Sequence, residues 1–202
     1  MPGQAMTCGG LVWRRVAHSK GERHGGQDGR GASAGTALTA GTLLPLTTAA
    51  LVGWQIGVYV DGWYHLHYSF EIETFFTWPH ALLYAGWAVT GLIPALALGE
   101  GIGHGLPRRV WLPAGYVLVL VGSAIFGLGG AFDFIWHSLV GFEARQEAVL
   151  APSHLWLEVG FMVSAFGLLQ AATLQRTRAG SAGARPRAID VPVILALAVF
   201  LR

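Results

Sequence analysis

The segment VWLPAGYVLVLVGSAIFGLGGAFDFIWH, residues 110–137, is almost entirely apolar and holds one charged side chain, that of Asp133. An α-helix needs ~20 residues to cross the hydrocarbon core of a bilayer, so this segment is long enough to span it. Three further apolar segments of similar length lie at about residues 42–64, 77–99 and 150–172. The sequence therefore predicts an all-α integral membrane protein with about four transmembrane helices.

The composition of the chain agrees with a membrane protein. Charged residues make up 12% of the 202 residues and hydrophobic residues 53%, whereas a soluble globular domain carries ~25% charged residues. Cys8 is the single cysteine, which excludes a disulfide framework and a thiolate metal site. The basic residues lie in connecting segments rather than along one face, so we expect the lipid bilayer, and no nucleic acid, as a partner.

Changes in composition divide the chain into four parts. Residues 1–40 are rich in Gly, Ser and Arg and lack apolar periodicity, which predicts a disordered basic cytoplasmic tail or sequence upstream of the true start. A four-helix membrane domain is expected at 41–174 and a cytoplasmic loop at 175–189. Residues 190–202 are apolar but too few to span a bilayer, which predicts a truncated fifth helix.

The distribution of charge predicts the orientation of the helices. Basic residues gather before the first apolar segment, between the second and third, and after the fourth. The two remaining connections are acidic and contain Glu71, Glu73, Glu143 and Glu147. By the positive-inside rule, the N-terminus is cytoplasmic and the acidic connections face the extracytoplasmic side of the cell membrane.

Polar residues recur along the chain with a period of about 72 residues. The two copies are DGWYHLHYSFEIETFFTWPHALLYAG, 61–86, and DFIWHSLVGFEARQEAVLAPSHLWLEVG, 133–160. The matched pairs are Asp61 and Asp133, His65 and His137, Phe70 and Phe142, Glu71 and Glu143, Pro79 and Pro152, His80 and His154, and Gly86 and Gly160. We therefore predict an internal repeat of one helical hairpin, as repeat A at 42–99 and repeat B at 110–172.

Each predicted hairpin gathers one carboxylate and two imidazoles at its outer end. The Asp and the first His are four residues apart, which puts both side chains on one face of a helix. The second His follows a Pro that suits the first turn of the next helix, so it returns to the same depth. Such groups are costly to bury in a membrane unless they are paired, hydrated or functional.

One carboxylate and two imidazoles suit Zn(II), Cu(II), Fe(II) or Mn(II) and leave coordination positions open. The candidate metal ligands are Asp61, His65 and His80 in repeat A and Asp133, His137 and His154 in repeat B. Glu158 lies one turn beyond His154 on the same face of the helix. We predict that it serves as a fourth ligand or as a hydrogen-bond partner of a ligand. Tyr84 takes the position of Glu158 in repeat A.

The pattern D-x3-H followed by P-x-H-L resembles the copper-site segment of the C subunit of particulate methane and ammonia monooxygenases. In that family an Asp, a His four residues on and a His that opens the next helix bind copper within the membrane. The resemblance covers about 28 residues of each repeat and is stronger in repeat B, through Trp136-His137 and Pro152-Ser153-His154. The resemblance implies that the metal is copper and that its ligands are Asp133, His137 and His154. It also implies that the protein is a subunit of an oxidoreductase.

Other interpretations of the same residues stay open. The groups could form an Asp–His hydrogen-bond pair that closes each hairpin, or could serve a transporter or proton relay that holds no fixed metal. A b-type haem with His80 and His154 as axial ligands is a further alternative. The sequence leaves open whether the chain forms a homo-oligomer or binds partner membrane subunits, and it names no substrate.

Overall fold

The computed structural model of the chain describes residues 40–68, 74–105, 112–141 and 150–181. The remaining segments include nearly all of the predicted N-terminal tail and all of the predicted fifth helix at 190–202. Those two predictions therefore lie outside the described residues, as do Glu71 and Glu143.

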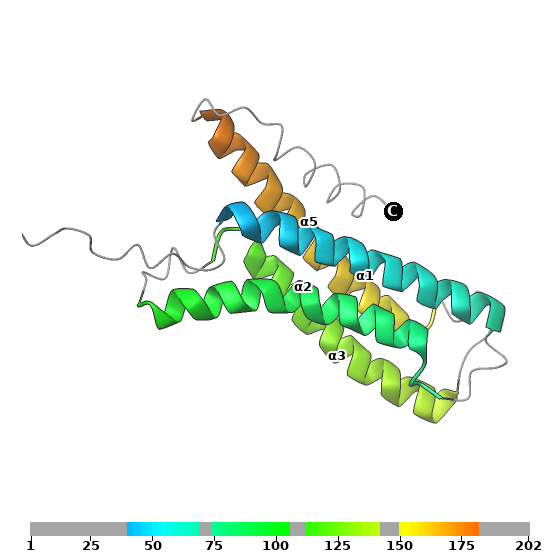
Figure 1. Ribbon diagram of the computed structural model, residues 1–202. Coiled ribbons are helices and arrows are strands. Elements are labelled where there is room, and N and C mark those ends of the chain that lie inside the picture. Colours follow the sequence, from blue (N-terminus) through cyan, green and yellow to red (C-terminus); the bar gives the residue numbers. More distant parts are fainter. Residues whose placement is uncertain (1–39, 69–73, 106–111, 142–149, 182–202) are drawn as a thin grey trace, which may run out of the picture. The chain divides into compact units, whose positions relative to one another are not determined.

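The described residues form four α-helices and contain no strand. The helices are α1 (Ala40–Tyr68), α2 (Trp78–Gly103), α3 (Tyr116–Val140) and α5 (Pro152–Ser181), shown in Figure 1. Each contains a segment long and apolar enough to cross a membrane, and these segments are Gly41–Tyr68, Trp78–Gly103, Tyr116–Val140 and Pro152–Arg178. The predicted fold class, an all-α membrane protein with its helices in contact with the bilayer, is confirmed.

All four helices end beyond the apolar segments that identified them, and two of them do so through charged residues. α5 runs through Arg176 and Arg178 to Ser181, so the first part of the loop predicted at 175–189 is helical. α2 likewise passes through Glu100 and ends at Gly103. Glutamate, glutamine and arginine are good helix formers, so a helix that leaves the bilayer does not stop where its apolar residues stop.

The four helices pack as two pairs. α1 packs along α2, and α3 packs along α5, while less extensive contacts join α2 to α3 and α1 to α5 (Figure 1). Glycines bring the helices of the first pair close together. A Cβ atom on Gly86 would lie 2.5 Å from the Cα of Trp54, and one on Gly57 would lie 2.8 Å from the Cα of Leu83. Small residues permit this backbone approach between membrane helices.

The second pair makes the corresponding contacts. A Cβ atom on Gly160 would lie 2.5 Å from the backbone nitrogen of Phe126, and one on Gly129 would lie 3.3 Å from that of Leu157. In the aligned repeats, Phe126 and Leu157 stand at the positions of Trp54 and Leu83. Matched positions therefore set the spacing of the helices in both pairs.

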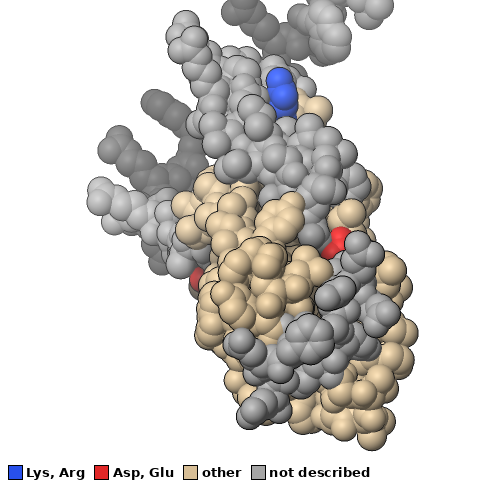
Figure 2. Space-filling view, turned by 90° about the vertical axis from the view of Figure 1, so that its right-hand side faces the viewer, with Lys and Arg blue, Asp and Glu red and all other residues tan. Residues whose placement is uncertain are grey.

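An aromatic core joins the two pairs. The Trp54 side chain of α1 is fully buried and meets Phe126 of α3 edge-on, with ring centroids 4.7 Å apart, and Phe161 of α5 at 4.9 Å. On the outside, large apolar side chains such as Leu92, Leu128 and Leu139 are exposed, as lipid-facing residues of a membrane protein are. On the face drawn in Figure 2, most of the described residues are uncharged.

Candidate metal centre

The six predicted ligands lie at one end of the helix bundle. They are Asp61 and His65 near the end of α1, His80 in the first turn of α2, Asp133 and His137 near the end of α3, and His154 in the first turn of α5. Pro79 lies in the first turn of α2, and Pro152 opens α5. Proline has no N–H to donate, which costs nothing in a first turn, and it fixes where the following His enters the bundle.

The first three ligands form triad A, which consists of Asp61, His65 and His80. Their ligand atoms all lie within 4.8 Å of one another, and all three residues are buried. The His80 Nε2 atom is 3.5 Å from Asp61 Oδ1 and 3.4 Å from His65 Nε2. The His65 Nε2 atom is 3.9 Å from Asp61 Oδ2. Residues of α1 and α2 thus converge on one point.

Triad B consists of Asp133, His137 and His154, whose ligand atoms also lie within 4.8 Å of one another. Asp133 Oδ1 lies 3.3 Å from His137 Nε2 and 3.2 Å from His154 Nε2. The two Nε2 atoms are 3.4 Å apart, and the two rings are 5.3 Å apart at their centroids, both as in triad A. The Asp133 side chain is only 1% exposed, so its charge is held away from solvent.

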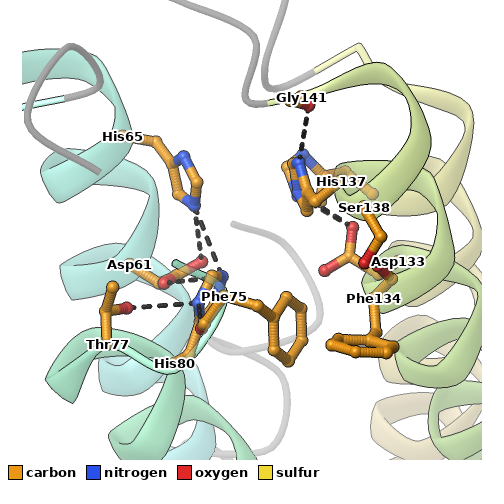
Figure 3. Close-up of polar contacts among 11 residues, drawn as sticks. Asp61, His65, Phe75, Thr77, His80, Asp133, Phe134, His137, Ser138 and Gly141 are labelled. Atoms are coloured by element: carbon orange, nitrogen blue, oxygen red, sulfur yellow. Dashed lines mark hydrogen bonds and ion pairs between the residues drawn. The ribbon is translucent and has the colours of Figure 1, made fainter. Parts of the chain in front are cut away.

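A backbone carbonyl fixes the proton on one imidazole of each triad (Figure 3). The His80 Nδ1 atom is 2.6 Å from the Phe75 carbonyl oxygen, and the His137 Nδ1 atom is 3.1 Å from that of Gly141. A carbonyl oxygen only accepts hydrogen bonds, so each Nδ1 carries a proton and donates it. In a neutral imidazole the Nε2 atom is then an acceptor. Both Nε2 lone pairs point toward a carboxylate of the same triad.

Few hydrogen bonds of good geometry reach the two carboxylates. Within the part of the chain that is described, neither oxygen of Asp133 accepts a hydrogen bond of good geometry, and the same holds for Asp61 Oδ1. A buried acceptor without a donor costs free energy. A cation bound by the carboxylate oxygen and the two Nε2 atoms of each triad would remove this cost.

The donor set of each triad therefore fits a transition metal. One carboxylate oxygen and two imidazole nitrogens converge, and the Nδ1–H groups of His80 and His137 are held by carbonyl oxygens. A metal-bound His almost always donates its other ring N–H to such an acceptor, which fixes the tautomer and orients the ring. The sequence did not predict these carbonyls, because their positions depend on the turns at Phe75 and Gly141. Gly141 has a φ of 90°, a backbone conformation that favours glycine and ends α3.

Glu158 lies outside both triads. It is not among the groups of three ligand atoms within 4.8 Å, and instead lines a cavity of about 280 Å³ together with Asp61, His65 and His154. The other lining residues are Val58, Gly62, Leu83, Phe126, Leu150, Leu155, Leu157 and Phe161. The cavity lies between α1 and α5, so Glu158 shares it with triad A as well as with its own repeat. A role for Glu158 toward the metal remains a prediction.

The two triads lie side by side. The His65 ring of triad A is 6.0 Å from the His137 ring and 5.6 Å from the His154 ring of triad B, measured between centroids. The first of these ring pairs is stacked, with 15° between the planes. The sequence alignment did not predict this contact, because a repeat relates two hairpins without stating how they pack.

Comparison with protein-family models, with curated proteins and with solved structures gave no match to this chain. The case for its function therefore rests on the geometry of the triads and on the resemblance in local sequence.

Proposed function

We propose that this chain is a multi-pass protein of the cell membrane whose Asp/His/His triads bind a divalent transition metal, with copper favoured. The observation that carries the proposal is the contact that the Nδ1 atoms of His80 and His137 make with backbone carbonyl oxygens. Each uses its Nδ1–H on a backbone carbonyl and presents an Nε2 lone pair, 3.5 Å and 3.3 Å respectively, to a buried carboxylate oxygen. A divalent cation satisfies such a set of acceptors, whereas an Asp–His pair without metal needs a proton between the carboxylate oxygen and the Nε2 atom.

Copper is favoured by the donor set together with the sequence resemblance. Two imidazoles and one carboxylate leave coordination positions open, as catalytic metal sites do. The copper-site segment of the monooxygenase C subunits has the same order of Asp, His and His. By that resemblance, the chain is an oxidoreductase subunit that works with partner membrane subunits, and Asp133, His137 and His154 are its principal ligands.

We further propose that the membrane domain arose by duplication of one hairpin. The equal Nε2–Nε2 distances of the two triads support this proposal, as do the matched glycine contacts of Gly57 and Gly86 with those of Gly129 and Gly160. The positive-inside rule places the triads toward the extracytoplasmic face, where metal would reach them without crossing the membrane.

A transporter or proton relay is the second candidate function. It is favoured by the cavity that Glu158 shares with Asp61, His65 and His154, since a chain of carboxylates and imidazoles at membrane depth can pass protons. A haem between His80 and His154 is disfavoured, because the Nε2 atom of each already lies 3.2–3.5 Å from the carboxylate of its own triad.

The variant Asp133→Asn distinguishes a metal site from an Asp–His pair. An amide has nearly the shape of the carboxylate, but it is a weaker metal ligand and its NH₂ group can donate to the Nε2 lone pair of His137. We expect the affinity of triad B for Cu(II) to fall at least ~10-fold, as it does when metal-site residues are lost, and the metal-free protein to keep its thermal stability. Isothermal titration in detergent and thermal unfolding give the two values.

The matched control is Glu100→Gln, which removes a carboxylate of α2 outside both triads and should leave Cu(II) binding unchanged. A pairing role for Asp133 predicts the opposite result, with a loss of thermal stability and no effect on any metal. That result would replace the metal proposal.

A further inference from the structure

His65 brings the two triads into contact. Its ring lies 5.6 Å from the His154 ring and 6.0 Å from the His137 ring, against 5.3 Å from His80 within its own triad. Figure 3 shows triad A, on α1 and α2, facing Asp133 and His137 on α3. The spacing between the triads is therefore almost the same as the spacing within one.

Each triad nevertheless forms a site of its own. The ligand atoms fall into two groups of three, each within 4.8 Å, and each group has its own carboxylate and its own pair of facing Nε2 atoms. A single ion would occupy one group and leave the buried carboxylate of the other group without a cation. Six ligands in this arrangement suit two ions rather than one.

Resting on the proposed metal binding, we propose that the two triads form one paired-metal centre, with two metal ions bound side by side and bridged by a small anion. Two-metal sites in proteins hold their ions close enough to share such a bridging ligand. The inference assigns one ion to Asp61, His65 and His80 and the other to Asp133, His137 and His154.

The charges of the site indicate why a bridging anion is needed. Two divalent cations exceed the charge of the two Asp carboxylates, and their repulsion is strong in a low-dielectric environment. The cavity of about 280 Å³ touches Asp61 and His65 of triad A and His154 of triad B, so an anion such as hydroxide placed there would reach both ions. Glu158 borders the same cavity and adds a third carboxylate near the cations.

Electron paramagnetic resonance of the 202-residue chain loaded with Cu(II) tests the paired centre. Two Cu(II) ions that share a bridging ligand couple their spins. We expect about two copper ions per chain. Their signal should be well below the intensity of two isolated spins, because the shared bridging ligand couples the spins of the two ions. The variant His80→Ala, which leaves triad B intact, should bind about one copper ion and give the full signal of an isolated spin.

Loading the wild-type protein with a mixture of Cu(II) and excess Zn(II) provides the same test without a variant. Zn(II) has no unpaired spin, so most copper would then have a zinc neighbour, and the isolated signal should appear. Two copper ions with full, uncoupled intensity would overturn the paired centre while leaving metal binding in place. The paired centre would also be overturned if the wild-type protein bound one copper ion per chain and the variant His80→Ala still bound it. Protein that binds no copper or zinc would overturn the proposed function itself.

Discussion

At the scale of single residues, position decides which histidines can serve as ligands. His67 lies two residues beyond His65 on α1, yet it is exposed, and its Nδ1–H donates to the Trp63 carbonyl at 2.8 Å. His65 lies one turn after Asp61 and is buried with it. The i, i+4 spacing of Asp and His, together with the Pro before the second His, identified the members of each triad from the sequence.

Tyr84 and Glu158 mark a difference between the two halves. They occupy matching positions in the repeats, and each lines a cavity beside the triads. The Tyr84 hydroxyl is buried and has no hydrogen-bond partner among the residues that the structure describes. The α1–α2 pair therefore places a phenol, and the α3–α5 pair a carboxyl group, next to the candidate metal centre.

At the scale of helices, the number and type of the elements could be predicted because lipid demands long apolar segments. The ends of α2 and α5 could not, since the polar residues there also favour helix. The partners of each His were only partly predictable. Membership of a triad follows from local spacing, whereas the carbonyls of Phe75 and Gly141 depend on how two turns fold.

The close contacts of the helix pairs make a prediction about stability. A methyl group at Gly160 would lie 2.5 Å from the backbone of Phe126, and one at Gly86 would lie 2.5 Å from that of Trp54. Overpacking of a tight contact costs ~1–3 kcal/mol. We therefore expect Gly160→Ala and Gly86→Ala each to lower the free energy of unfolding in mixed micelles by about that amount.

Gly53→Ala is the control for these two substitutions. Gly53 lies in α1, and a methyl group there would meet nothing within 4 Å. Alanine favours helix over glycine by up to ~1 kcal/mol, so this variant should be unchanged or slightly more stable. Equal effects of all three substitutions would show that the glycines act on the single helix and not on the spacing of pairs.

At the scale of the whole molecule, the packing of one pair against the other creates the site. Each hairpin alone brings three ligands together, but the neighbouring position of the two triads arises only when α1 approaches α5 and α2 approaches α3. A repeat in the sequence cannot state that packing, because it depends on shape rather than on period. The packing of the two pairs also explains the position of Glu158. Its sequence spacing assigned it to triad B, yet it lines a cavity together with Asp61 and His65 of triad A.

The orientation of the four helices in the membrane is a prediction about the whole molecule. Basic residues favour the cytoplasmic side, so reporter fusions near Gly105 and Ala182 should read as cytoplasmic and fusions near Glu73 and Glu147 as extracytoplasmic. The reverse pattern would place the triads on the cytoplasmic side. An unequal pattern within either pair would contradict four membrane-spanning helices.

Metal content tests the central claim most directly. The 202-residue chain is purified in detergent, incubated with Cu(II) and freed of unbound ions, and its metal content is compared by elemental analysis with that of two variants. We predict near-stoichiometric copper in the wild type and in His67→Ala, whose side chain belongs to neither triad. The combined replacement of His80, His137 and His154 by Ala should remove it. Wild-type protein that stays free of metal, or copper that persists in the triple variant, would contradict the assignment of the triads as a metal centre.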